Sequence, residues 1–333
     1  MILNNEPRGR YFLKRVLITG GKGQDGTLLR QLLESQGIQV FCFGRPAESL
    51  NLTSQSLPAD MNSLEFNVDL SNLDICLNSV ASVNPDTIFH LAAVHAPSDV
   101  MGSELWKMNR ESTYKTHVTI TRNLIDAILE TNIKSQLIVA GSSRMYTPIE
   151  STLIVNETTT TSPVDYYGET KARSWETLIA ERDRTGLTLK MAILFNHESK
   201  LRKEGYLFRD LAKQIRLFES GSQDYIEMRD PKFRGDWHSA QNTAEGLLLM
   251  ANCEKVTDLV LASGRLISVS DIITTYFKTY SPRKLPKIVS KSPGIYQRNR
   301  VSVVGDITLA KNLGWTPNHT LTSVLHEMVL SES

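Results

Sequence analysis

Residues 15–37 have the sequence RVLITGGKGQDGTLLRQLLESQG. Arg15–Thr19 is a short apolar run typical of a strand, and leucines at helical spacing follow the glycines. Between them, Gly20, Gly23 and Gly26 predict a turn in which the backbone can approach a pyrophosphate at a helix N-terminus. Three glycines alone would fit a simple tight turn, but the flanking strand and helix are what a dinucleotide-binding motif requires.

The segments that follow continue this alternation. Short β-rich runs recur between amphipathic segments up to about residue 195, which predicts a parallel sheet covered on both faces. Beyond that point the alternation weakens. The predicted fold is α/β, a Rossmann-like doubly wound parallel sheet with a smaller mixed C-terminal substrate lobe. The expected boundaries are a tail at 1–14, an NAD(P)-binding domain at 15–195, and a mainly substrate-binding lobe at 196–333 of which about 238–262 returns to the first domain. Further strands are expected at 38–43, 64–68, 86–93, 136–140 and 187–194, with a helix at 103–132 and a loop at 155–163.

Bulk composition excludes several classes of partner. The chain has 333 residues, of which 41% are apolar and 22% charged, as in an ordinary globular protein. Its net charge of +1 and its scattered basic residues argue against a nucleic-acid partner. No apolar run is long enough to span a membrane, and Cys42, Cys76 and Cys253 lack metal-ligand or redox spacing. We therefore expect a cytoplasmic protein without a metal site.

A second motif predicts the chemistry. Tyr167 and Lys171 lie four residues apart in a predicted helix, so their side chains share one face. A nearby ammonium lowers the pKa of a phenol, and such a tyrosine can exchange a proton with a carbinol oxygen near neutral pH. Ser142, at the end of a predicted strand, could hold that oxygen. This set suits hydride transfer between an alcohol and a nicotinamide; the alternative is a solvated lysine beside a half-buried tyrosine.

The choice of cofactor depends on the end of the second strand. Arg45 stands there where NAD-selective proteins usually place an acid, and a guanidinium suits a 2′-phosphate. We therefore expect NADP, with NAD kept open by Glu48 and with a solvated Arg45 as the alternative. Asp69 is placed either to meet the adenine end or to cap a helix from Ser71. His90 is expected to pack inside its strand rather than to bind a ligand.

Several stretches together make the chain resemble a known family. They are TGGKGQDG at 19–26, FHLAA at 89–93, YGETK at 167–171, LFNHES at 194–199, and GD at 305–306 with LGWTP at 313–317. With these the chain resembles the extended short-chain dehydrogenase/reductases of the nucleotide-sugar epimerase/dehydratase family, most of all the GDP-mannose 4,6-dehydratases. The resemblance implies a GDP-linked sugar diphosphate as substrate and a homodimer or homotetramer.

The resemblance also implies a role for each matching position. Tyr167 would be the acid/base at the sugar C4 hydroxyl, Lys171 would bind the nicotinamide ribose, and Ser142 stands at the catalytic Ser/Thr position. The expected cofactor-binding residues are Gly20, Gly23, Gln24, Asp25, Gly26, Arg45, Asp69, Leu70, Leu91, Ala92, Ala93, Tyr167, Lys171, Leu194, Asn196 and His197. The expected substrate-binding residues are Ser143, Asn196, Arg202, Arg234, and Arg298 or Arg300.

One departure from the family decides the expected reaction. The dehydratases have a Glu two residues before the equivalent of Tyr146, and it removes the C5 proton during elimination. This chain has Arg144 there, and a guanidinium is always protonated, so it cannot be that base. We therefore expect reduction of a 4-keto-6-deoxy sugar, or oxidation and epimerisation at C4. Arg144 itself would either meet an anionic or hydroxyl group of the substrate or form a surface salt bridge.

Two other functions stay open from the sequence. One is a true 4,6-dehydratase with a relocated base, for which Glu198 and His197 are the candidates. The other is a non-catalytic NADP-binding sensor, which would not need the Ser142, Tyr167 and Lys171 set to be intact.

Overall fold

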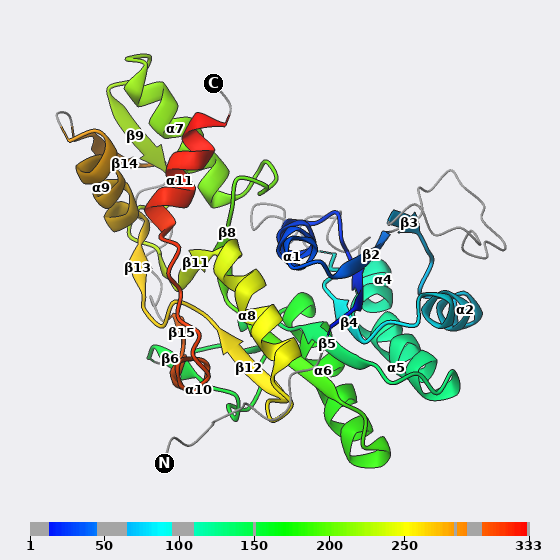
Figure 1. Ribbon diagram of the computed structural model, residues 1–333. Coiled ribbons are helices and arrows are strands. Elements are labelled where there is room, and N and C mark those ends of the chain that lie inside the picture. Colours follow the sequence, from blue (N-terminus) through cyan, green and yellow to red (C-terminus); the bar gives the residue numbers. More distant parts are fainter. Residues whose placement is uncertain are drawn as a thin grey trace, which may run out of the picture.

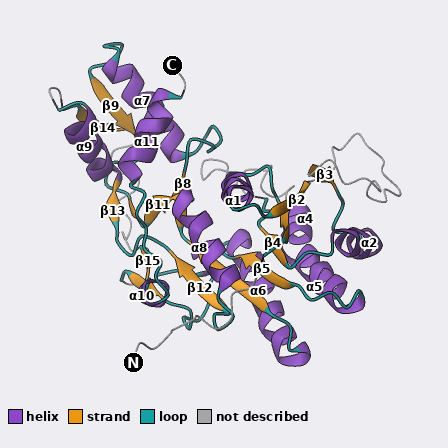
Figure 2. Cartoon of the chain, viewed as in Figure 1, coloured by secondary structure: helices purple, strands orange, loops and turns teal. Residues whose placement is uncertain are grey.

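The computed structural model describes residues 13–44, 65–94, 110–148, 151–282, 285–291 and 302–331. Within these ranges the chain forms a large sheet domain and a smaller lobe, which lies at the upper left in Figures 1 and 2. No helix in the described ranges is both long and apolar enough to cross a bilayer. The same residues contain no cluster of His, Cys, Asp and Glu suited to a metal ion.

The large domain is built on seven parallel strands. Their order in the sheet is β12-β7-β5-β4-β1-β2-β3. After β3 the next strand, β4, is added on the other side of β1, so the strand order reverses there and the sheet is doubly wound. Val16 of β1, for example, pairs with Val40 on one side and Thr87 on the other. The predicted fold class is confirmed. The strands are β1 (Arg15–Thr19), β2 (Gln39–Gly44), β3 (Glu65–Asn67), β4 (Thr87–His90), β5 (Gln136–Ala140), β7 (Leu189–Leu194) and β12 (Asp258–Leu261).

Helices cover both faces of this sheet. α1 (Gln24–Ser35) packs with α8 (Ala240–Asn252) on one face, while α2 (Leu73–Val83), α5 (Ile120–Glu130) and α6 (Tyr166–Thr185) cover the other (Figure 1). The central strands are buried along their whole length, which explains their continuous apolar sequences. Asp165 caps α6 by accepting from the backbone N–H of Gly168 at 2.9 Å, and Gly186 ends that helix with φ +72°.

The smaller lobe has its own apolar core. It consists of α7 (Leu207–Glu219), β9 (Tyr225–Met228), α9 (Val269–Tyr280), β14 (Lys287–Ser290) and α11 (Leu321–Leu330). Two short strands, β8 (Asn196–Glu198) and β11 (Trp237–Ser239), pair with each other where the chain passes between the two bodies. β10 (Arg234–Gly235) pairs with β13 (Ile267–Ser268). The lobe therefore stands beyond the carboxyl ends of the sheet strands.

Three details differ from the expected pattern. The described part of the helix expected at 103–132 is α4 (Arg110–Tyr114) and α5, joined by a π-helical turn, Lys115–Thr119. The expected loop at 155–163 is preceded by β6 (Leu153–Val155), which pairs with the distant β15 (Val303–Gly305) outside the main sheet. α10 (Thr308–Asn312) packs on the large domain, because Ala310 joins the core beneath β12. Such short elements depend on distant partners and leave no periodic signal.

Candidate active site

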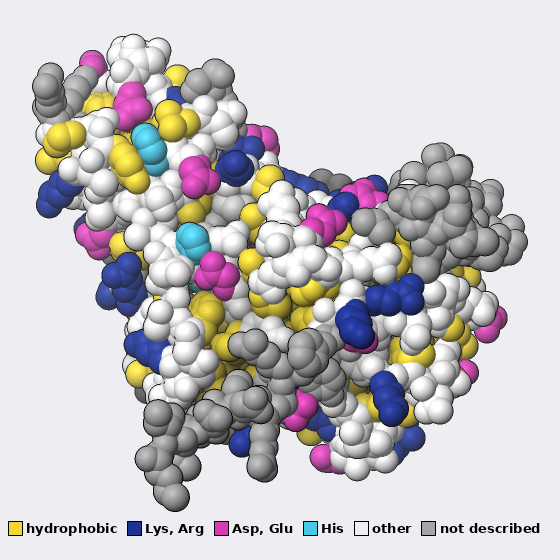
Figure 3. Space-filling model, viewed as in Figure 1, with side chains coloured by type: hydrophobic (Ala, Val, Ile, Leu, Met, Phe, Trp, Pro, Cys, Tyr) yellow, Lys and Arg dark blue, Asp and Glu magenta, His cyan; other side chains and the backbone are white. Residues whose placement is uncertain are grey.

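A cleft of about 1120 Å³ lies along the carboxyl edge of the sheet. This is where doubly wound folds place ligands, and the volume exceeds that of a typical drug-sized pocket. Figure 3 shows the surface hollowed between the lobe and the large domain, with acidic and basic side chains intermixed rather than gathered. The predicted residues that line the cleft are Gly20, Gly23, Gln24, Asp25, Asp69, Leu70, Leu91, Ala92, Ala93, Ser142, Ser143, Arg144, Tyr167, Lys171, Leu194, Asn196, His197 and Arg202.

The glycine-rich turn forms one wall of the cleft. Gly20 has φ +76°, and a Cβ there would stand 2.7 Å from the backbone nitrogen of Ala92. A Cβ on Gly26 would overlap the carbonyl oxygen of Gly20, so Gly26 lies under the turn rather than in the cleft. Gly23 precedes α1, and no side chain caps this helix. The backbone thus offers a narrow cradle at an uncapped helix N-terminus, as a pyrophosphate group requires.

His90 is a structural residue at the end of β4. It is 1% exposed, with Nδ1 bonded to the Thr19 hydroxyl at 2.6 Å and Nε2 to the Thr116 carbonyl at 3.0 Å. Burial, together with the nearby Lys171, lowers the pKa of His90 to about 3. The prediction that His90 packs inside its strand is confirmed.

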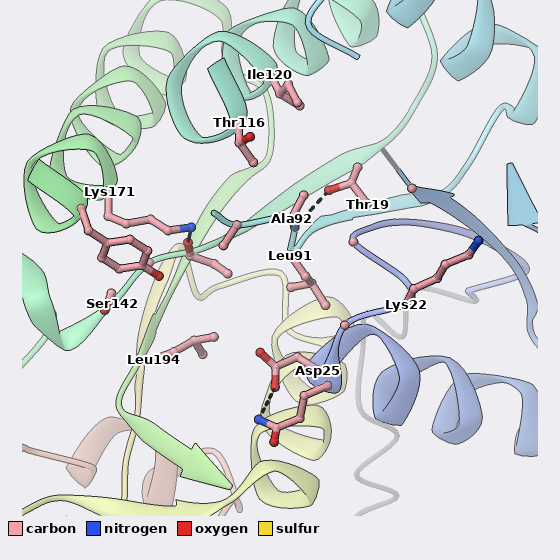
Figure 4. A pocket seen from close by; sticks show the side chains of 18 of the residues that line it. Thr19, Lys22, Asp25, Leu91, Ala92, Thr116, Ile120, Ser142, Lys171 and Leu194 are labelled. Atoms are coloured by element: carbon pink, nitrogen blue, oxygen red, sulfur yellow. Dashed lines mark hydrogen bonds between the residues drawn. The ribbon is translucent and has the colours of Figure 1, made fainter. Parts of the chain in front are cut away.

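Ser142, Tyr167 and Lys171 converge on the same side of the cleft. Tyr167 and Lys171 come from α6 and are 7% and 2% exposed, while Ser142 follows β5. In Figure 4, Lys171 and Ser142 face the space that Asp25 and the glycine-rich turn face from the opposite side. The ammonium of Lys171 donates to the carbonyl of Ala140 at 2.8 Å. The sequence motif therefore places a hydroxyl, a phenol and an amine around one volume.

The electrostatics of this group differ from the expectation. Burial raises the pKa of Tyr167 to about 12, and the cation that opposes this rise is Arg144. Burial lowers the pKa of Lys171 to about 7, with Asp25 opposing. The ammonium lies 5.9 Å from the centroid of the Tyr167 ring and is turned toward Ala140. The expected lowering of the Tyr167 pKa is therefore not found, because burial outweighs the effect of Arg144.

Arg144 forms part of the cleft wall. Its Nε and Nη2 donate to one carboxylate oxygen of Asp165 at 3.0 and 2.7 Å, and both side chains are mostly buried. Its Cζ stands 5.1 Å from the centroid of the Tyr167 ring. Because Arg144 touches the phenol ring as well as Asp165, it is more than a surface salt bridge.

A second charged group joins the glycine-rich turn to β8. His197 Nε2 lies 2.9 Å from the carboxylate of Asp25, and its Nδ1 lies 2.6 Å from the carbonyl oxygen of Phe195. Burial alone would raise the pKa of Asp25, but His197 and Arg202 hold it at about 2. Burial disfavours the charged imidazole, yet Asp25 raises the pKa of His197 above its ordinary value. Since both partners of His197 only accept, both ring nitrogens donate and the ring is an imidazolium.

Glu198 and Arg202 extend this group. Glu198 is 6% exposed and accepts from Arg202 Nε at 2.8 Å, and Arg202 also donates to the carbonyl of His197. Burial raises the pKa of Glu198, and Arg202 opposes the rise. The four charges thus form two ion pairs and sum to zero: Asp25 pairs with His197, and Glu198 pairs with Arg202.

Several predicted residues lie elsewhere. Arg234 is exposed on β10, away from the cleft lining. Asp69 lines the cleft and accepts from Ser71, but the cap of α2 is Asn72, so the expectation that Asp69 caps this helix is wrong. Arg45, Arg298 and Arg300 fall outside the described residues. Cleft residues that the sequence did not indicate include Lys22, Glu111, Ser112, Lys115, Thr116, Phe195, Lys203 and Tyr206. Only Lys22, inside the glycine motif, carried a local signal.

A family model described as GDP-mannose 4,6 dehydratase matches residues 17–328, which include both bodies and the whole described cleft. The chain belongs to the GDP-mannose 4,6-dehydratase family. This places it in the wider nucleotide-sugar epimerase/dehydratase group that the sequence resembles. Arg144, half-buried and paired with Asp165, stands at the position where the sequence resemblance places a catalytic Glu.

Relatives and solved structures agree with this placement. GDP-mannose 4,6-dehydratase sdnI of Sordaria araneosa is 26% identical over 96% of this chain, which spans 61% of that protein's length. GDP-mannose 4,6 dehydratase 2 of Caenorhabditis elegans is 26% identical, with 96% of this chain and 89% of the relative covered. MoeE5 in complex with UDP-glucuronic acid and NAD gives a TM-score of 0.71 at 21% identity, covering 95% and 97% of the two chains. RMD from Pseudomonas aeruginosa complexed with NADPH gives 0.72 at 18% identity, covering 95% and 98%. These structures share the fold.

Proposed function

We propose that this member of the GDP-mannose 4,6-dehydratase family is an NAD(P)-dependent enzyme that transfers hydride at C4 of a nucleotide-linked sugar. The reaction is reduction of a 4-keto-6-deoxy sugar, or oxidation and epimerisation at C4. The observation that carries the proposal is an intact Ser142, Tyr167 and Lys171 set beside Arg144, which is paired with Asp165 and stands where the resemblance places the family's elimination base.

The cleft fits a nicotinamide dinucleotide. A side chain at Gly20 or Gly26 would collide with backbone atoms of the turn and of β4's end, and the N-terminus of α1 opens toward the cleft. Small residues at Ala92 and Ala93 leave space beside β4. Structures with the same fold that contain NAD or NADPH support this cofactor. The preference for NADP rests on Arg45.

Each residue of the set has one task in the reduction. Bound reduced nicotinamide supplies the hydride to C4. Tyr167 gives its hydroxyl proton to the former carbonyl oxygen, which becomes the C4 hydroxyl. Ser142 donates a hydrogen bond to the same oxygen, and Lys171 holds the ribose of the dinucleotide. In the oxidative direction Tyr167 takes the proton back.

The runner-up is a dehydratase with a relocated base, and the relatives' names favour it. The geometry of both candidate bases argues against it. Both nitrogens of His197 already donate, so this ring has no lone pair for a substrate proton. Glu198 could act only after its buried ion pair with Arg202 is broken. A non-catalytic sensor is disfavoured because the Ser142, Tyr167 and Lys171 set is complete.

Mass spectrometry of two incubations tests the proposal. A C4 reductase should leave GDP-mannose with NADP unchanged and should add two hydrogens to GDP-4-keto-6-deoxymannose with NADPH. Tyr167→Phe should slow the second reaction by about 10²- to 10⁴-fold. Loss of one water in the first tube would establish the dehydratase instead. A fully active Tyr167→Phe variant would remove Tyr167 from the mechanism. A GDP-linked sugar as the substrate and a homodimer or homotetramer as the assembly also belong to this proposal.

A further inference from the structure

Arg144 is held in place at three points. Its backbone N–H donates to the Ser142 hydroxyl at 3.2 Å, and its guanidinium is bound by Asp165. Its carbonyl packs directly on Gly168 of α6, where a Cβ would overlap the Arg144 oxygen. Because the chain before it, the helix after it and its own side chain are all engaged, Arg144 has one position relative to Tyr167.

Asp165 links this position to the helix that carries the phenol. One of its carboxylate oxygens accepts from the Gly168 N–H and starts α6. The other accepts both N–H groups of Arg144. The same carboxylate therefore sets the start of the Tyr167 helix and the direction of the guanidinium beside the Tyr167 ring.

The other charged groups around Tyr167 are placed less favourably than Arg144 to stabilise a phenolate. Lys171 is farther from the ring centroid, at 5.9 Å against 5.1 Å for Arg144, and it donates to a backbone carbonyl. Burial lowers the pKa of Lys171 to about 7, so its charge is partly lost near neutral pH, whereas a guanidinium keeps its charge. Asp25, Asp165 and Tyr206 all oppose ionisation of the phenol. His117 meets the Tyr167 ring edge-on, with 5.1 Å between centroids.

We propose that Arg144, oriented by Asp165, is a second cation that stabilises the Tyr167 phenolate in this chain, beside Lys171. The residue at the position that the resemblance assigns to the elimination base thus acts in this chain as a positioning residue for the C4 acid/base. This inference rests on the proposed function, in which Tyr167 exchanges the C4 proton. Replacement of an acid by Arg144 removes the base for elimination and supports proton exchange at the C4 oxygen.

Ionisation of the phenol can be measured without any substrate. 3,5-Difluorotyrosine is placed at position 167, because its more acidic phenol titrates where the protein stays folded, and the phenolate is followed by its absorbance. Arg144→Gln should raise the midpoint by about 1–3 pH units, as loss of a cation within about 4–6 Å does. Arg144→Lys should raise it less, since the charge remains but the fork on Asp165 is lost.

Matched variants make the outcome decisive. Arg173→Gln removes an exposed cation of the same helix, one that pairs with Glu169, and should leave the midpoint unchanged. Arg144→Met serves as a second neutral variant if Arg144→Gln is poorly folded by circular dichroism. A midpoint that moves no more in Arg144→Gln than in Arg173→Gln would overturn the inference, even if C4 reduction is observed. If the midpoint rises as expected but C4 sugars do not react, the proposed function fails while the role of Arg144 stands.

Catalysis supplies a second readout. In the oxidative direction, kcat near neutral pH should fall about tenfold for each pH unit by which the phenol midpoint rises, while KM changes little. The acidic limb of the pH profile, where activity is lost as the phenolate is protonated, should move to higher pH by the same amount. A purely structural loss would lower kcat at every pH without moving the limb.

Discussion

Replacing Asp25 with Asn removes the charge that holds His197 while keeping the size of the side chain. The pair is 2.9 Å apart with both side chains mostly buried, so solvent screens it weakly. Lowering the pKa of Asp25 from 3.8 to about 2 corresponds to about 2 kcal/mol of folding free energy, since a tenfold change in proton affinity is about 1.4 kcal/mol. We expect Asp25→Asn to destabilise the protein by about this amount at mildly acid pH.

The pH window follows from the direction of each shift. The pKa of Asp25 is depressed in the folded state, so its contribution is present above pH 3.8 and is lost as pH falls toward 2. The pKa of His197 is raised, so its contribution is full below its ordinary value of about 6.5 and is lost as pH rises through the raised value. The pair should therefore stabilise the protein most between about pH 4 and pH 6.5.

A double-mutant cycle in urea measures this pair directly. Asp25→Asn, His197→Gln and the double variant should give a coupling free energy of about 2 kcal/mol at about pH 5.5, shrinking at about pH 9.5. The exposed pair of Glu169 and Arg173 is the matched control and should couple by only about 0.3–0.5 kcal/mol. A coupling no larger than the control, or one equal at both pH values, would refute the assignment of His197 as an imidazolium.

Three further experiments test the cradle, a buried carboxylate and the core of the lobe. Gly26→Ala drives a methyl group into the carbonyl of Gly20, so it should lower the free energy of unfolding by about 1–3 kcal/mol and abolish dinucleotide binding. Gly23→Ala has more room and should lower stability and binding less. Urea unfolding and NADPH fluorescence titration compare the two variants. The two carboxylate oxygens of Asp236 accept from backbone N–H groups at 263, 264 and 305. Asp236→Asn replaces one of these oxygens by an N–H₂ that cannot accept, and should cost about 1–3 kcal/mol in the same unfolding assay. Phe277→Ala empties the lobe core and should cost about 3–5 kcal/mol, seen as earlier unfolding or proteolysis of the lobe.

Local patterns predict the parts of the site that belong to one stretch of chain. The glycine turn, the Tyr167–Lys171 spacing and Ser142 each follow from strand and helix periodicity. Parallel topology then brings them to one edge of the sheet, so their common cleft is also predictable.

Contacts across the fold are what the sequence could not supply. Asp25 and His197 are far apart in the chain, and no periodicity pairs them. Arg144 and Asp165 are 21 residues apart, and the stretch between them, which includes β6, carries no periodic pattern that would pair them. The π-helical turn at 115–119, which brings Thr116 to the cleft, breaks the period on which helix prediction depends.

These long-range contacts bear on the reaction more than the motifs do. The motifs are shared by reductases, epimerases and dehydratases alike, so they cannot separate them. The paired charges can, because elimination needs a basic group free to take a proton from carbon. In the described cleft His197 has no free lone pair, and Glu198 accepts from a buried guanidinium. Arg144, at the family's base position, is bound to Asp165. Proton exchange with oxygen at Tyr167 needs none of these groups to act as a base, which is why we propose redox chemistry at C4.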